Sequence, residues 1–159
     1  MIAVSDNSPL HYLILLDQTG LLPRFYGTVL IPRAVQCELS AAGAPSKVSE
    51  SLRGGWDWLR VEDVAAEQLE AVSKELDMGE REAIALARAV GADILLIDDS
   101  AGREQARRVD LRVTGTLGIL RAAAQIGGLI DVRSTIAMLR ETSFYFDENL
   151  IRSLFEEWL

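Results

Sequence analysis

The amino-acid sequence predicts an α/β protein in three layers (α/β/α), with a mainly parallel sheet of four to five strands between two layers of helices. Short apolar runs rich in β-branched residues alternate along the chain with longer segments of helical pattern. Strands separated by helices pair in parallel, because the crossover returns the chain to the same end of the sheet. The 159 residues contain neither a repeat nor a long polar linker, so we expect a single domain over residues 1–159.

Five short segments carry the signals of strands. Each is a brief apolar run that ends at turn residues or at a helix cap. The predicted strands are residues 1–5, 28–31, 58–61, 94–97 and 111–114.

The helices are predicted from caps and from the period of the apolar residues. Ser8-Pro9 is a cap followed by proline at the first helical position, and Gly20 ends the helix that begins there. Residues 42–55 carry Gly, Pro and Ser, which favours a loop with at most a short helix. The predicted helices are residues 8–19, 32–41, 65–76, 80–90, 100–109, 116–126, 131–141 and 147–158.

The charge of the chain is acidic. Its 16 Lys and Arg residues face 24 Asp and Glu residues, for a net charge of −8. This balance argues against a protein that coats nucleic acid by charge alone. It does not exclude a nuclease, because metal ions and a local arginine patch reverse the sign at one site. Only Lys47 and Lys74 are lysines, and arginine suits forked contacts to phosphate.

The cysteine and hydropathy patterns bear on location. Cys37 is the only cysteine, so no internal disulfide forms, which suits the cytoplasm, and we expect a buried thiol. No run of about 18 apolar residues is present, so no membrane-spanning helix is expected. The N-terminal residues lack the pattern of a secretory signal.

Acidic residues follow two of the predicted strands at the point where each strand ends. Asp6 comes directly after the first strand, and Asp98 and Asp99 come directly after the apolar run ILLI. In an open parallel sheet, ligands bind beyond the carboxyl ends of the strands. These three acids are therefore expected at one edge of the sheet, although they are far apart in the sequence.

Two further acids lie on apolar helix stripes. Glu38 shares a stripe with Val35, and Glu80 leads into one that includes Ile84, whereas Glu82 is expected nearer to solvent. Neither stripe contains Lys or Arg, and a buried carboxylate without a partner is unstable. The simplest shared partner is a divalent cation, since Mg²⁺ and Mn²⁺ prefer carboxylate oxygens. Two such ions about 4 Å apart activate water for phosphodiester hydrolysis.

Four stretches, in this order, resemble a known family: DNSPL near the start, IPRAVQCEL, GEREAIALA and LLIDDSAGR. Their order is similar to that of the PIN-domain superfamily, in a prokaryotic branch related to the VapC-type toxin ribonucleases. The resemblance covers residues 1–127, and the C-terminal helices at 131–158 lie beyond it. It implies the same three-layer fold with a metal-dependent nuclease site.

In that family four acids form the metal site, and the resemblance carries these roles over by position. Asp98 joins or replaces the last of the four. Many relatives carry Asp at the third position, where this chain has Glu, and a single Asp at the fourth, where it has Asp-Asp. The implied catalytic and metal-binding residues are Asp6, Glu38, Glu80 and Asp99, with Asp98 as a further ligand and Ser8, Thr114 and Thr116 as supporting residues.

The resemblance also implies an activity and partners. The activity is that of a Mg²⁺- or Mn²⁺-dependent endoribonuclease that hydrolyses phosphodiester bonds in single-stranded RNA. The chain is then the toxin half of a toxin–antitoxin pair, inhibited by an antitoxin protein in the acidic groove. A homodimer is implied because PIN relatives often pair.

Each residue also has a structural alternative. Asp6 and Asp98 are common types at turns and caps, and Glu80 favours a helix N-terminus through the macrodipole. Glu38 alone has Arg33 as a competing partner. Arg103 and Arg107 either contact phosphate or form a solvated helix face.

Two other function classes stay open. The net charge and the Asp-Asp pair are compatible with a non-catalytic PIN-like module that binds a protein or RNA. A phospho-acceptor or phosphatase domain also clusters acids at strand ends. It wants an acid pair after the first strand, however, and this chain has Asp6-Asn7-Ser8 there. The single histidine, His11, excludes metal sites built on paired histidines.

Overall fold

A computed structural model describes residues 1–159 and contains one sheet of five strands, in the order β3-β2-β1-β4-β5. All neighbouring strands are parallel, so the predicted mainly parallel sheet is confirmed. The strands are β1 (Ile2–Ser5), β2 (Thr28–Pro32), β3 (Leu59–Glu62), β4 (Ile94–Leu96) and β5 (Val113–Thr114). β1 lies at the centre, with β2 on one side and β4 on the other.

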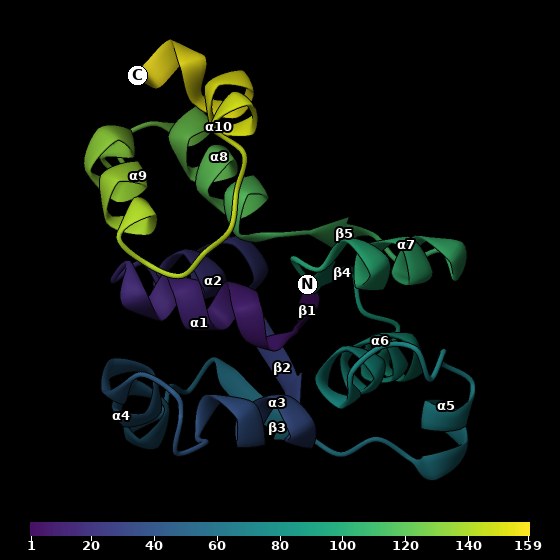
Figure 1. The fold of residues 1–159 in the computed structure, drawn as a ribbon. Helices are drawn as coiled ribbons and strands as arrows, with labels where there is room; N and C mark the ends of the chain where they lie inside the picture. Colours follow the sequence, from purple (N-terminus) through teal and green to yellow (C-terminus); the bar gives the residue numbers. More distant parts are fainter.

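Ten α-helices and a short 3-10 turn surround the sheet (Figure 1). The first part of the chain forms α1 (Asn7–Leu15), α2 (Leu21–Tyr26), α3 (Arg33–Leu39), α4 (Ser46–Gly54) and α5 (Ala66–Glu70). The second part forms α6 (Met78–Val90), α7 (Ser100–Arg108), α8 (Thr116–Ile126), α9 (Val132–Arg140), α10 (Glu148–Phe155) and η1 (Glu156–Trp158).

Successive strand residues face two separate cores, as expected from the alternation of side chains along a strand. Ala3 and Leu96 belong to a core of 24 buried residues that also takes side chains from α1–α4 and α8–α10. Val4 and Leu95 belong to a core of 12 buried residues shared with α6 and α7. Helices therefore cover both faces of the sheet, and the predicted three-layer α/β/α architecture is confirmed.

Several local predictions were wrong. Helix α2 was not predicted, because its apolar stretch is short and contains Pro23. The helix predicted over residues 65–76 ends at Glu70, after which the chain turns and buries Val72 and Leu76 in the smaller core. The thiol of Cys37 is exposed.

Glu82 was expected near solvent, but it is half-buried and its carboxylate accepts the backbone N–H of Ala34 (3.1 Å). It thereby ties the start of α3 to α6.

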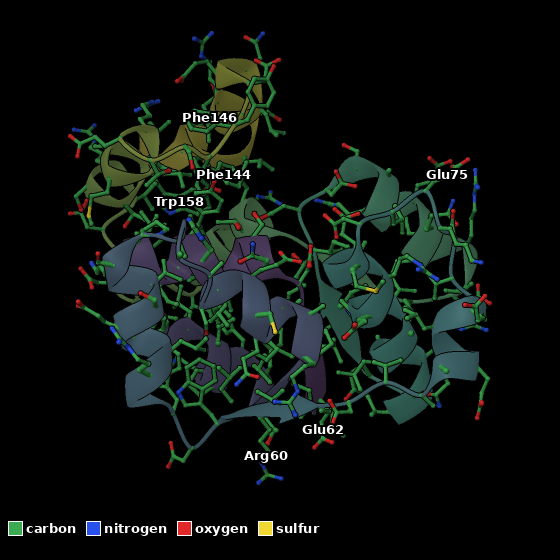
Figure 2. The ribbon with its side chains drawn as sticks, turned by 60° about the horizontal axis from the view of Figure 1, so that its bottom comes forward. Arg60, Glu62, Glu75, Phe144, Phe146 and Trp158 are labelled. Carbon is green, nitrogen blue, oxygen red and sulfur yellow. The ribbon has the colours of Figure 1, made fainter.

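The C-terminal helices pack on the larger core through aromatic side chains. Phe144, Phe146 and Trp158 are partly buried against it, and Figure 2 shows them among these helices. Arg60 and Glu62 instead point outward from the edge strand β3 (Figure 2). None of the helices combines the length and the apolar character that a membrane crossing requires.

Candidate functional site

The carboxyl ends of β1 and β4 lie side by side where the strand order reverses. Ser5 is in register with Leu96, and the backbone N–H of Asp6 donates to the Leu96 carbonyl (2.8 Å). The chain leaves β1 toward one face of the sheet and β4 toward the other, which opens a crevice at this point. Asp6 and Asp98 therefore come to the same edge of the sheet, despite their separation in the sequence.

Asp6 is the most buried acid of this edge, with 6% of its surface exposed. It occupies the position before α1, but its side chain makes no capping hydrogen bond. Burial, with a smaller contribution from the nearby carboxylates of Asp77, Glu38 and Asp98, raises the pKa of this carboxyl from 3.8 to about 7, and the backbone N–H of the adjacent Asn7 opposes the rise. The structure thus shows no side-chain capping hydrogen bond that would support Asp6 as a simple helix cap.

Glu38 reaches the site from α3. Val35 and Leu39 of this helix are buried in the larger core, whereas Glu38 lies close to Gly79 on α6. A β-carbon at Gly79 would collide with the Glu38 carboxylate, so this glycine is what lets the two helices approach. Burial raises the pKa of Glu38, the Asp77 carboxylate adds to the effect, and a hydrogen bond from the Asn7 side chain opposes it.

The start of α6 contributes Glu80 and also Asp77, which was not predicted as a site residue. Asp77 caps α6 by accepting the backbone N–H of Glu80 (2.8 Å). Burial and, after it, the carboxylates of Asp77, Asp99 and Asp6 together raise the pKa of Glu80 to about 8. The sequence feature that could have identified Asp77 as a site residue is its position directly before the acidic first turn of α6.

Asp98 and Asp99 have different surroundings. Asp98 accepts hydrogen bonds from the Ser8 hydroxyl (2.6 Å) and from both the N–H and the hydroxyl of Thr116 (2.7 Å each). A β-carbon at Gly115 would lie 2.5 Å from an Asp98 oxygen, so the glycine allows this approach. Asp99 instead caps α7 through the N–H of Gly102 (2.9 Å).

Of the three predicted supporting residues, Ser8 and Thr116 therefore contact an acid of the site directly. Thr114 is half-buried, and its hydroxyl lies against Gly118 and makes no hydrogen bond to the acids.

None of these acids has a basic partner. The five ion pairs of the structure lie elsewhere, and Arg33, the competing partner for Glu38, pairs with Asp63 (3.1 Å). The Oδ1 atom of Asn7, next to Asp6, is buried without a hydrogen-bond partner.

A set of oxygen donors that includes a buried carboxylate and an unpaired amide oxygen fits a hard divalent cation. No group of three or more His, Cys, Asp or Glu side chains is spaced as ligands of one ion. The fit of this site to a divalent cation therefore rests on the chemical type of its donor atoms and not on their spacing.

The predicted phosphate-contact residues lie on α7, beside this edge. Arg103 is half-buried and Arg107 is exposed, and neither side chain takes part in an ion pair or hydrogen bond with another residue. Arg108 instead pairs with Glu104 (2.7 Å) on the same helix. Arg108 therefore belongs to a local Arg–Glu pair, whereas the guanidinium groups of Arg103 and Arg107 have no protein partner, which fits either a phosphate contact or a solvated helix face.

Comparison with known proteins identifies the family of the chain. A family model described as a PIN domain matches residues 2–158. The chain belongs to the PIN domain family. PIN domains are generally nucleases that bind RNA and use divalent metal ions. A search of curated proteins found no match to the chain.

A solved structure supports the same assignment at the level of the fold. This PIN domain is similar to a PilT N-terminus domain protein from the hyperthermophilic archaeon Sulfolobus solfataricus P2, with a TM-score of 0.56 and 18% sequence identity. The match covers 77% of this chain and 92% of the archaeal one. At this identity the likeness concerns the fold alone.

Proposed function

We propose that this PIN domain is a ribonuclease that uses Mg²⁺ or Mn²⁺ to hydrolyse phosphodiester bonds in single-stranded RNA. The observation that carries the proposal is Asp6, a buried carboxyl without a basic partner, among other carboxylates at the switch point of the sheet. Burial of an acid in this way costs stability, and such sites are typical of function rather than of packing.

In this proposal Asp6, Glu38, Glu80 and Asp99 are the residues that would hold divalent metal, and Asp98 would add to the same negative charge. Divalent metal held there would supply charge neutralisation of the acids, activation of water and stabilisation of the leaving oxygen of the phosphodiester. Ser8 and Thr116 keep the Asp98 carboxylate in one orientation, since both hydroxyls donate to it. The free guanidinium groups of α7 bind phosphates of the RNA beside the cut.

The proposal is tested by cleavage of a labelled single-stranded RNA by the purified protein. We expect cutting with Mg²⁺ or Mn²⁺, none in excess chelator, and none in the Asp6→Asn variant. Asp17→Asn is the matched control. Asp17 follows the far end of α1, has a positive φ of 56° that Asn adopts readily, and pairs with Lys47 on the surface (2.8 Å). Cutting that persists in chelator rejects the mechanism.

We further propose that the protein is the toxin half of a toxin–antitoxin pair, that an antitoxin covers the acidic groove, and that the toxin forms a homodimer. The support is the sequence resemblance to VapC-type ribonucleases. Expression of the wild-type chain should arrest bacterial growth, whereas expression of Asp6→Asn should not. Equal growth in both cultures contradicts the toxin assignment while leaving the cleavage test untouched.

A phospho-acceptor domain of the response-regulator type also uses a lysine near its acids, and neither lysine of this chain lies there. Lys47 pairs with Asp17 and Lys74 pairs with Glu70 (3.3 Å) on the surface. Labelling with a small acyl-phosphate donor checks it, and we expect no incorporation. A non-catalytic module is the outcome if the folded protein binds RNA but neither binds Mn²⁺ nor cuts.

A further inference from the structure

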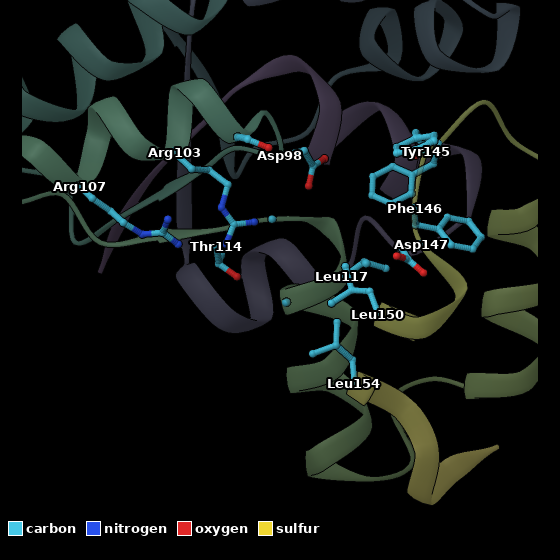
Figure 3. Close-up of a pocket in the computed structure, with 14 residues that line it drawn as sticks. Asp98, Arg103, Arg107, Thr114, Leu117, Tyr145, Phe146, Asp147, Leu150 and Leu154 are labelled. Carbon is cyan, nitrogen blue, oxygen red and sulfur yellow. The ribbon is translucent and has the colours of Figure 1, made fainter. Parts of the chain in front are cut away.

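A cavity of about 630 Å³ opens beside the acidic cluster and has two chemically different walls (Figure 3). Arg103 and Arg107 of α7 line one side, and Tyr145 lies on the other with Leu150 of α10. Asp98 also lines the cavity, so a chain bound at the acids would extend into it. Its volume is within the range of about 300–1,000 Å³ that is typical of small-ligand pockets.

The two guanidinium groups of the basic wall form no ion pair with a protein carboxylate. Arg103 and Arg107 are four residues apart on α7, so their side chains leave the same face of the helix. The two acids that line the cavity are already hydrogen-bonded: Asp98 accepts from Ser8 and Thr116, and Asp147 accepts the N–H of Asn149 (2.7 Å). The guanidinium forks are therefore the groups left to bind an anion, and their geometry suits phosphate.

The opposite wall presents an exposed aromatic ring on a fixed segment. Phe144 packs edge-on against Tyr12 of α1, with ring centroids 4.9 Å apart, and stacks with Phe146 at 6.1 Å. The Tyr12 hydroxyl also forms a hydrogen bond with that of Ser143 (2.9 Å). Tyr145, between these anchors, has 93% of its surface exposed. Its ring is thus held at the cavity without being used for packing.

We propose that this cavity is a nucleotide subsite, in which Arg103 and Arg107 bind phosphates of a single-stranded RNA and Tyr145 stacks on one of its unpaired bases. The inference rests on the proposed ribonuclease function and extends it to the substrate. Paired phosphate-binding forks, an exposed ring and an opening onto the acids are the elements of single-strand recognition. A base inside a duplex is already stacked on its neighbours and does not offer its face to Tyr145.

The test measures binding of a fluorescent single-stranded oligoribonucleotide by fluorescence anisotropy, in chelator so that no cleavage occurs. Tyr145→Ala should weaken binding about fivefold or more, because a base–aromatic stack has that effect, and Tyr145→Phe should restore it. Arg103→Gln and Arg107→Gln should each lower the slope of log affinity against log salt by about 0.7. Arg108→Gln is the matched control, since it removes the same charge from outside the cavity.

Two further arms separate this inference from the proposed function. Asp6→Asn should keep the Tyr145-dependent binding while losing cleavage, so failure of the enzyme and failure of the subsite give different results. A fully paired RNA of the same sequence should show no dependence on Tyr145. If Tyr145→Ala binds as tightly as the wild type and Arg103→Gln behaves like Arg108→Gln, the subsite is refuted.

Discussion

The burial of Asp6 predicts an unusual dependence of stability on pH. Its carboxyl has a pKa of about 7 in the folded protein against 3.8 in the reference state. Below 3.8 both states hold the proton, and between 3.8 and about 7 only the folded state does. Because the unfolded state then binds fewer protons, the free energy of unfolding falls as the pH rises, by about 1.4 kcal/mol per pH unit. Above pH 7 the loss from this residue is complete, at about 4 kcal/mol.

Asp6→Asn removes this contribution, because the amide does not titrate. The amide itself shifts the stability by an amount that is the same at every pH, so the comparison uses the slope of stability against pH. Urea unfolding in chelator between about pH 4 and about pH 8 measures it. We expect the variant to lose markedly less stability over this range than the wild type, and Asp17→Asn to follow the wild type. Parallel profiles for Asp6→Asn and the wild type would refute the reasoning.

Three other experiments probe the acids at this edge of the sheet and the residues that contact them. Mn²⁺ should raise the thermal midpoint more at about pH 8 than at about pH 5, because Asp6 and Glu80 hold protons at the lower pH that compete with the metal; equal shifts by calorimetry contradict this. Gly79→Ala should displace the Glu38 carboxylate and weaken Mn²⁺ affinity, while the free energy of unfolding from circular-dichroism melts changes by about 1 kcal/mol or less. Unchanged Mn²⁺ affinity would contradict a role for the contact between Gly79 and Glu38 in metal binding. Thr116→Val should lower the free energy of unfolding, measured in urea, by about 1–3 kcal/mol and should slow cleavage, since it removes a buried hydroxyl donor to Asp98. Unchanged stability together with unchanged cleavage would contradict the role assigned to Thr116.

The sequence was informative where chemistry follows directly from strand order. Asp6 and Asp98 come straight after apolar runs, and parallel strands end at the same edge, so their meeting did not depend on any side-chain detail. Ser8 was identified by likeness alone, and the structure adds its hydrogen bond to Asp98.

Other features depend on contacts between remote segments and could not be read from local patterns. Asp77 looks like any helix cap until α3 brings Glu38 beside it. The cavity exists because residues 144–147 return to face α7, which no periodicity predicts. Helix α2 and the early end of α5 show tertiary packing overriding a weak local signal.

The most direct test of the metal-dependent site is a calorimetric titration of the metal-free protein with Mn²⁺. We expect saturable binding with release of protons, because Asp6 and Glu80 have raised pKa values and hold protons that a bound cation must displace. Binding should be lost in Asp6→Asn and kept in Asp17→Asn. No heat of binding at about millimolar Mn²⁺, or equal binding by wild type and Asp6→Asn, would contradict the claim that these acids hold a divalent ion.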